Sequence, residues 1–429
     1  MSRWSGAQFW RATEFAYAIL ALFALTQGPV YRLWSQSALL VDSLPSPSIP
    51  HAYFATFVAV QLPAVVLLAR RAPGSWFALR SNQALVALLA WLGLSVLWSS
   101  FARHSLPEFV ALVLTTAFGV YLAASFSLRQ FWVVVASAMA LGVGVSWVAV
   151  MRLWDGAFNF LEGYWIGIYF NRNSLAPVAA VAMIAAVGLV VTAWQPTKDG
   201  AQKRLIVAAV PAATLFAFSA IELWQSESQT SPLAIVTALL VCLLWLFLRR
   251  LAGRNSRLSP LLGLSTGATL AITAVAMFVA LRMEVLVGGV ETATTAFNQR
   301  SGLWSISWEG FRQKPWLGWG WFAAWRDPLF LLSMDEPTWM AWDLEWSHSG
   351  YFDLLLGGGV PAAVLFAAFV WLGSRRISQS RDTDGLGGLL LVAYVLAAAT
   401  QESFFIGSHF LWALLVAGLS ATPDRRLVD

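Results

Sequence analysis

Long apolar stretches recur along the whole 429-residue chain, and they limit its fold more than any other feature. About 20 apolar residues are enough to cross a bilayer as a helix, because each helical residue advances the chain by about 1.5 Å. The sequence therefore predicts an all-α, polytopic membrane protein with about twelve transmembrane helices. The predicted spans are residues 12–30, 52–69, 82–100, 106–124, 131–150, 174–194, 204–221, 231–249, 260–283, 347–373, 386–401 and 403–421.

The last two predicted spans are separated only by a minimal turn at Gln401 and Glu402. A re-entrant pair of helices is therefore an alternative to two complete spans in this part of the chain. The run Gly357-Gly358-Gly359, followed by Pro361, predicts a loosened or kinked helix in the tenth span.

Composition argues against a soluble protein. Only 11% of the residues are charged, whereas an ordinary soluble domain has about 25%. The single Cys242 excludes an internal disulfide and a cysteine-based metal cluster, and four histidines leave little room for a multi-histidine metal site. These counts give no support to a metal site built from cysteines or several histidines. The absence of a run of lysines and arginines leaves nucleic-acid binding without support.

Lysine and arginine predict the orientation. With the N-terminus in the cytoplasm, 18 of the 27 basic residues fall inside and four fall in short outer loops. The other five lie at or in residues 284–346, where the positive-inside rule has little force. We therefore expect cytoplasmic termini and an outer loop before the tenth helix. The chain then divides into helices 1–9 (residues 1–283), an outer loop with short helices (284–346), and helices 10–12 with a cytoplasmic tail (347–429).

Polar and ionisable residues gather in four segments of the predicted outer side, which are residues 152–174, 222–231, 282–353 and 401–409. Near a membrane such groups are costly unless they find partners or serve a function. We therefore expect the working surface of the protein to be its outer face.

The outer loop is rich in tryptophan. Indole rings favour the headgroup level of a bilayer, so an interfacial belt is one interpretation of any single tryptophan. The alternative is a wall for flat, amphipathic ligands such as sugars, and the clustering favours a partly folded binding cap. The nine residues are Trp304, Trp308, Trp316, Trp319, Trp321, Trp325, Trp339, Trp342 and Trp346.

Three stretches in a fixed order carry a family resemblance. They are G-I-Y-F-N-R-N-S-L at residues 167–175, R-S-G-L-W-S-I-S-W-E-G-F-R-Q-K-P-W-L-G-W-G at 300–320, and H-S-G-Y-F-D-L-L-L-G-G-G at 348–359. This pattern resembles the O-antigen ligase and O-antigen polymerase superfamily of membrane glycan transferases. The resemblance implies transfer of a glycan from a polyprenyl (undecaprenyl) pyrophosphate to an acceptor hydroxyl. It places the reaction at the outer face of the bacterial cytoplasmic membrane, without a metal or a nucleotide, so the resemblance implies no metal and no other cofactor.

The resemblance also assigns residues to the pyrophosphate. Arg300 matches a family arginine, and a guanidinium fork can bind phosphate oxygens in a bidentate manner. Arg172 is the second candidate, while Asn173 and Ser174 are interpreted as helix caps. Many family members carry a basic residue where this chain has Gln229, so that contact is missing or is replaced by another residue. Arg172, Arg312 and Lys314 are the candidates for the replacement.

His348 matches the family histidine, which implies that it activates the acceptor. An imidazole can accept a proton from a sugar hydroxyl, and a carboxylate can orient the ring. Acidic side chains lie near His348 in the sequence, and we expect supporting roles for two of them, Asp353 and Glu345, alongside Gln229. His51, His104 and His409 are expected to be structural.

The sequence is compatible with more than one function. A ligase attaches a finished glycan and a polymerase extends one, and the sequence does not decide between these acceptors. The expected partners are the lipid-linked donor, a glycan or lipid acceptor and membrane lipid. A transporter or lipid flippase is the alternative from a different class, although it should place charges near the middle of the bilayer rather than at one face. A membrane scaffold would leave the arginine and histidine positions unexplained.

Overall fold

The structure is a computed structural model, and it describes residues 6–35, 51–71, 80–193, 201–253, 296–332, 346–379 and 384–420. Most of these residues are helical, and the described part contains one isolated β-bridge, between Phe158 and Trp165. The helices are α1 (Gly6–Leu25), α2 (Gly28–Ser35), α3 (His51–Arg70), α5 (Gln83–Ser95), α6 (Ala102–Ser125), α7 (Leu128–Met151), α8 (Arg172–Ala193), α9 (Ala201–Gln225), α10 (Thr230–Gly253), α12 (Ala296–Gln313), the 3₁₀ helix η2 (Ala324–Arg326), α13 (Pro328–Leu332), α14 (Gly350–Gln379), α15 (Asp384–Ala398) and α16 (Phe410–Ser420).

Seven of these helices are long and apolar enough to cross a membrane: α3, α6, α7, α8, α9, α10 and α14. The pair α1 and α2, bent by 69°, makes an eighth candidate span. The helices α5, α15 and α16 are apolar but shorter. The structure thus confirms an all-helical, multi-pass architecture and provides a helix for eleven of the predicted spans. The remaining one, residues 260–283, lies outside the described residues, and the count of twelve stays a prediction.

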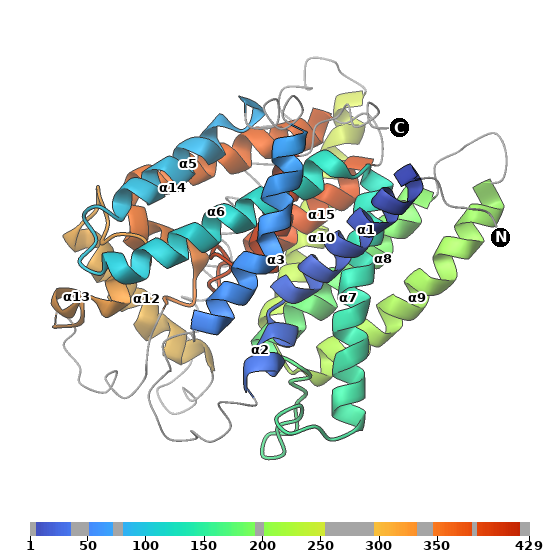
Figure 1. Cartoon of the computed structure of the whole chain (residues 1–429), viewed down its shortest axis with the longest axis horizontal. Helices are drawn as coiled ribbons and strands as arrows, with labels where there is room; N and C mark the ends of the chain where they lie inside the picture. Colours follow the sequence, from blue (N-terminus) through green and yellow to red (C-terminus); the bar gives the residue numbers. More distant parts are fainter. Residues whose placement is uncertain are drawn as a thin grey trace.

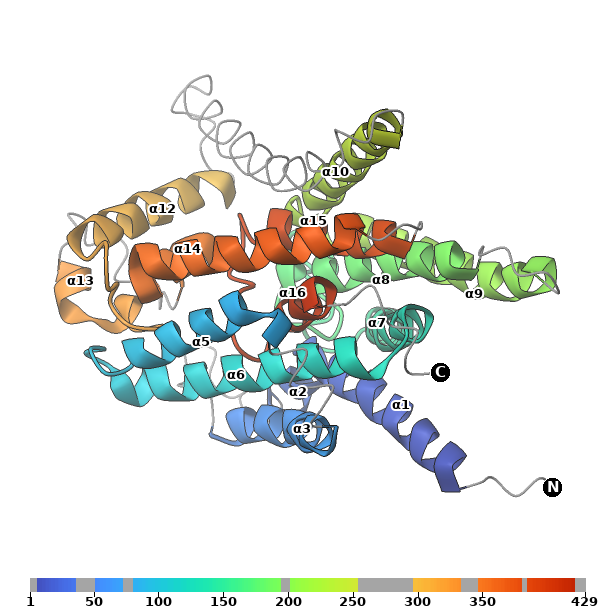
Figure 2. The same cartoon turned by 90° about the horizontal axis from the view of Figure 1, so that it is seen from above.

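Helix α16 lies in the interior of the bundle, where all eleven of its residues are buried. It packs against α6, α14 and α15, and α15 packs in turn against α8 and α10 (Figure 1 and Figure 2). The turn between α15 and α16 is also enclosed by protein, since most of residues 399–409 are buried. This enclosure matters because non-helical backbone at membrane depth is tolerated only where protein or water covers it.

Helix α14 is interrupted at Gly359, which has φ 65° and ψ −161°. This is the kink that the glycine run and Pro361 predict. A side chain at position 359 would come within 2.6 Å of the Pro315 carbonyl oxygen, so glycine is required for the close approach of the two segments.

The turn at residues 315–320 docks on this interruption and supplies hydrogen bonds that the broken helix lacks. Gly318 (φ 68°) and Gly320 (φ 96°) adopt the left-handed backbone that the turn needs. Loop and bundle are therefore joined through backbone groups. The two bonds of the turn run from Trp319 N to Leu356 O (2.7 Å) and from Val360 N to Pro315 O (2.8 Å). A third bond at the break comes from α5, where the indole Nε1 of Trp91 donates to Gly358 O (2.7 Å).

The described part of the predicted outer loop folds into a small helical unit. It consists of α12, η2 and α13, and α12 packs against α14 (Figure 2). Its own core includes Trp319 and Trp325, while Trp304 and Trp321 are also buried. These four indoles therefore pack the interior, whereas Trp308 and Trp316 remain 51% and 69% exposed. Trp339 and Trp342 lie outside the described residues.

Candidate active site

The four polar segments meet at one end of the helix bundle. A chain of hydrogen bonds runs through one residue of each: Ser228 of 222–231, Asn173 of 152–174, Glu402 of 401–409 and His348 of 282–353. Three of these residues lie directly beside a helix start, at α8, α10 and α14, and Glu402 lies in the turn before α16. The clustering expected from the polar residues is therefore present in the fold.

His348 contacts a carboxylate directly, with its Nδ1 atom 3.0 Å from Oε2 of Glu402. An ionised carboxylate only accepts hydrogen bonds, so this contact favours the tautomer with the proton on Nδ1. The other ring nitrogen, Nε2, is then available to accept a proton. The histidine side chain is 35% exposed and the glutamate side chain only 10%, so the ring borders the outside while its partner is enclosed.

The backbone at His348 is strained. Its φ of 49° lies in the left-handed region, which non-glycine residues seldom occupy and which is characteristic of functional sites. The next turn holds this conformation, because Gly350 N donates to the carbonyl oxygens of Ala399 (2.9 Å) and Glu402 (3.1 Å). A side chain at position 350 would collide with the ring of Phe405. The start of α14 is thus fixed on the turn between α15 and α16.

Glu402 is shared between His348 and Asn173. Its Oε1 atom accepts a hydrogen bond from Asn173 Nδ2 at 2.9 Å, and Asn173 Oδ1 accepts one from the Ser228 hydroxyl at 3.0 Å. A parallel contact joins the Thr230 hydroxyl to Gln401 Oε1 at 3.1 Å. Both carboxylate oxygens of Glu402 are therefore engaged, which fixes the rotation of the carboxylate group facing the imidazole.

Arg172 is the first residue of α8 and lies next to Asn173. Its guanidinium lies over the ring of Tyr164, 4.7 Å from the centroid, and forms no ion pair with a carboxylate of the described residues. The cap of α8 differs from the expectation. Asn171 supplies it through Oδ1, which accepts from Ser174 N at 2.9 Å. Asn173 is instead part of the hydrogen-bonded chain to His348.

The other predicted phosphate-binding residues are placed as follows. Arg300 lies near the start of α12, and its side chain is outside the described part of the structure. Gln229 is exposed, and its carbonyl oxygen accepts from Leu233 N in the first turn of α10. Arg312 forms an exposed ion pair with Glu309 at 3.0 Å. Lys314 lies over the ring of Trp319, with its Nζ 3.7 Å from the centroid.

Asp353, for which a supporting role is expected, bonds to the backbone before His348 and not to the imidazole ring. Its Oδ1 atom accepts from Ser347 N at 2.9 Å, and the Ser347 hydroxyl accepts from Trp325 Nε1 at 3.3 Å. The carboxylate thus fixes the residue that precedes His348 and reaches the ring only indirectly. Glu345 lies outside the described residues.

Glu402 is a candidate site residue that sequence reasoning did not assign, and its contact with His348 identifies it. The signal for it was weak, because it was one charged residue in a minimal turn between two apolar stretches. His409, in the same segment, has the structural role that was expected, since its Nδ1 accepts from Leu411 N at the start of α16. Within the described part of the chain, no three His, Cys, Asp or Glu side chains gather closely enough to hold a metal ion.

Comparison with known proteins identifies a family for part of the chain. The model of a family described as O-antigen ligase matches residues 214–367, a range that contains Gln229, Arg300, His348 and Asp353. This match confirms the resemblance to the O-antigen ligase and polymerase superfamily. It supports a membrane glycan-processing function of that type, with lipid-linked glycans as substrates, and with the apolar helices it points to the bacterial inner membrane. No curated protein matches the chain.

Proposed function

We propose that this protein, whose residues 214–367 match the O-antigen ligase family, transfers a glycan from undecaprenyl pyrophosphate to an acceptor hydroxyl at the outer face of the inner membrane. The observation that carries the proposal is the contact of His348 with Glu402 inside a hydrogen-bonded chain that joins four polar segments. A ligase reaction is the leading form of the proposal, and a polymerase reaction is the alternative within the same superfamily.

His348 acts as the general base in this proposal. The acceptor oxygen forms a bond to the anomeric carbon of the donor, and the bond from that carbon to the pyrophosphate oxygen breaks. The pyrophosphate leaves with the electron pair, and the acceptor proton moves to Nε2 of His348. Glu402 holds the ring in the required tautomer and stabilises the imidazolium that forms, because its carboxylate accepts from Nδ1.

Arg172 and Arg300 bind the pyrophosphate in this proposal. A diphosphate leaving group needs positive charge as its own charge develops. Arg172 suits the role because no described carboxylate neutralises it and because its neighbour Asn173 belongs to the chain that ends at His348. The alternative Arg312 is already paired with the carboxylate of Glu309.

Reconstitution of the purified protein tests the proposal. Proteoliposomes would receive undecaprenyl-pyrophosphate-linked glycan and acceptor, and glycan transfer would be measured beside donor binding. His348→Ala should lower transfer by about 10²–10⁴-fold while donor binding persists, since general-base assistance has this magnitude. His104→Ala, which removes a histidine outside the hydrogen-bonded chain, is the control. Transfer by His348→Ala at close to the wild-type rate would refute the mechanism.

A deletion strain separates the two forms of the reaction. A lost polymerase should leave lipid-linked single repeat units in the membrane, whereas a lost ligase should leave full-length lipid-linked chains. The chain length of the accumulated glycan is the measurement. A strain that accumulates neither would contradict both forms.

A further inference from the structure

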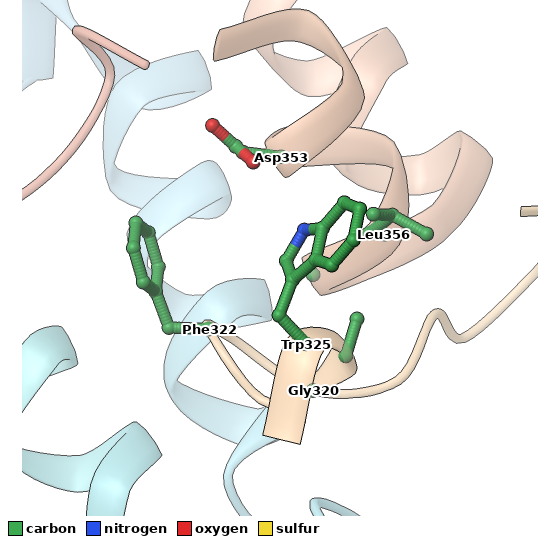
Figure 3. Close-up of a pocket in the computed structure, with 7 residues that line it drawn as sticks. Gly320, Phe322, Trp325, Asp353 and Leu356 are labelled. Carbon is green, nitrogen blue, oxygen red and sulfur yellow. The ribbon is translucent and has the colours of Figure 1, made fainter. Parts of the chain in front are cut away.

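A small pocket takes no part in the proton transfer described above, although its lining residue Asp353 bonds to the backbone of Ser347, next to His348. Its lining comes from the loop after the 315–320 turn and from the first turns of α14 (Figure 3). Figure 3 shows the rings of Phe322 and Trp325 on opposite sides and the carboxylate of Asp353 beside the gap between them. The lining residues are Gly320, Phe322, Ala324, Trp325, Asp353, Leu356 and Gly357.

One oxygen of the Asp353 carboxylate has a hydrogen bond of ordinary geometry, and the other does not. The residue is 7% exposed, and Oδ1 accepts from Ser347 N at 2.9 Å. Oδ2 forms no hydrogen bond of ordinary geometry with a described residue, although the buried hydroxyl of Ser403 lies beside the carboxylate. A buried carboxylate oxygen without a donor is unfavourable, so a hydroxyl that entered the pocket and donated to Oδ2 would be bound.

The two aromatic walls are held in place by different means. Trp325 is buried, and its indole N–H donates to the Ser347 hydroxyl, which fixes the ring plane. Phe322 is partly exposed and has a left-handed φ of 55°, a strained backbone that places its ring at the mouth of the pocket. A few polar groups between apolar walls orient a ligand, and aromatic rings with one carboxylate suit a group that carries both C–H and O–H bonds.

The size of the pocket restricts what can enter. It has room for about one water-sized group, so a hydroxyl or hydroxymethyl substituent fits and a whole sugar ring does not. Its position restricts the ligand further. Asp353 binds the backbone of Ser347, the residue directly before the base His348, and the pocket therefore adjoins the acceptor side rather than Arg172 at the start of α8.

We propose that this pocket is a specificity subsite for the acceptor glycan. It receives a hydroxyl or hydroxymethyl group that neighbours the reacting hydroxyl, which donates a hydrogen bond to Oδ2 of Asp353 while Phe322 and Trp325 flank its carbon atoms. The inference rests on the proposed transferase function, and it adds that Asp353 and Phe322 select the acceptor without taking part in the chemical step.

Steady-state transfer in proteoliposomes tests the subsite. The donor is undecaprenyl-pyrophosphate-linked glycan, and the titrated acceptor is the glycolipid extracted from membranes of the host bacterium. Asp353→Leu and Phe322→Leu should each raise the KM for the acceptor by about tenfold, the loss expected when one hydrogen bond to a charged group or one packed wall is removed. The KM for the donor should stay within about twofold, because pyrophosphate contacts are untouched. Leu329→Ala, an exposed change on α13 outside the pocket, is the control.

The possible outcomes separate the subsite from the proposed function. If the wild type transfers glycan and both variants keep the acceptor KM, the subsite is refuted and the transferase stands. A rise in the donor KM alone would place the pocket on the donor side and also refute it. No transfer by the wild type would refute the proposed function itself. If Asp353→Leu does not fold, Phe322→Leu still decides, because it leaves the carboxylate and its bond to Ser347 in place.

Discussion

Replacing Glu402 by glutamine gives the sharpest prediction, because the structure shows what both carboxylate oxygens do. Oε2 faces Nδ1 of His348 at 3.0 Å, and Oε1 accepts from Asn173 Nδ2 at 2.9 Å. Glutamine has nearly the same shape but offers one acceptor and one donor. It can satisfy the histidine N–H or the asparagine N–H, but not both.

The cost follows from which contact is lost. If the glutamine oxygen faces Asn173, its N–H₂ group faces the imidazole and favours the tautomer with the proton on Nε2. A protonated Nε2 cannot take the proton from the hydroxyl of the acceptor. In serine proteases a carboxylate orients the catalytic histidine, and replacing that carboxylate by an amide lowers kcat by about 10⁴-fold. Because the His348 side chain here is partly exposed and its tautomer is less strongly held, we expect a loss in kcat of about 10²–10⁴ for Glu402→Gln.

A compensating change makes the reasoning testable. Asn173→Asp in the Glu402→Gln background lets the glutamine donate to the new carboxylate and turn its oxygen to His348, while Ser228 still donates to residue 173. The double variant should recover at least tenfold in kcat over Glu402→Gln, whereas Asn173→Asp alone brings two carboxylates together and should impair transfer. The assay is single-turnover transfer in proteoliposomes with saturating donor. A well-folded Glu402→Gln protein within about threefold of the wild type would refute the role of Glu402.

Three further predictions concern donor binding and stability. Arg300→Lys should lower transfer by about ten- to a hundredfold, because lysine keeps the charge and loses the bidentate fork. Arg172→Ala should be nearly as harmful as Arg300→Ala. Unchanged KM values for the donor in these variants would contradict the prediction. Gly359→Ala should destabilise the protein by about 1–3 kcal/mol in thermal melts, since φ is 65° there, whereas Gly388→Ala, with open space around it, should be neutral. Glu222→Met should raise the melting temperature, because both carboxylate oxygens are buried without a hydrogen-bond partner in the described structure; an unchanged or lower value would contradict this.

Several features of the fold could be predicted from the sequence because they depend on short stretches. Apolar runs of membrane length predict helices, since a bilayer demands that each backbone polar group be satisfied within its own segment. The kink at Gly359 followed from three glycines and a proline in close succession. Polar segments could be located because charges are rare in this chain, and His348 was selected by its match to the family histidine.

The burial of the loop tryptophans depended on packing rather than composition. An interfacial belt and a binding wall were both compatible with the sequence, yet Trp319, Trp321 and Trp325 fill the core beneath the loop. What decided this was the docking of the 315–320 turn on the broken helix α14, which encloses the indoles between loop and bundle. Tertiary structure also decided the cap of α8. Asn171 caps the helix, and Asn173 bonds to Glu402 instead.

The partner of the proposed base, His348, was decided by tertiary structure alone. Glu402 lies 54 residues after His348 and 229 residues after Asn173 in the sequence. No periodicity links such distant positions, because hydrophobic patterns record which face of a helix is apolar and not which helix packs against it. The side chains meet because the buried turn between α15 and α16 is held against the starts of α8, α10 and α14. The sequence thus determined the helices and the polar segments, and the packing of the helices decided which carboxylate lies against His348.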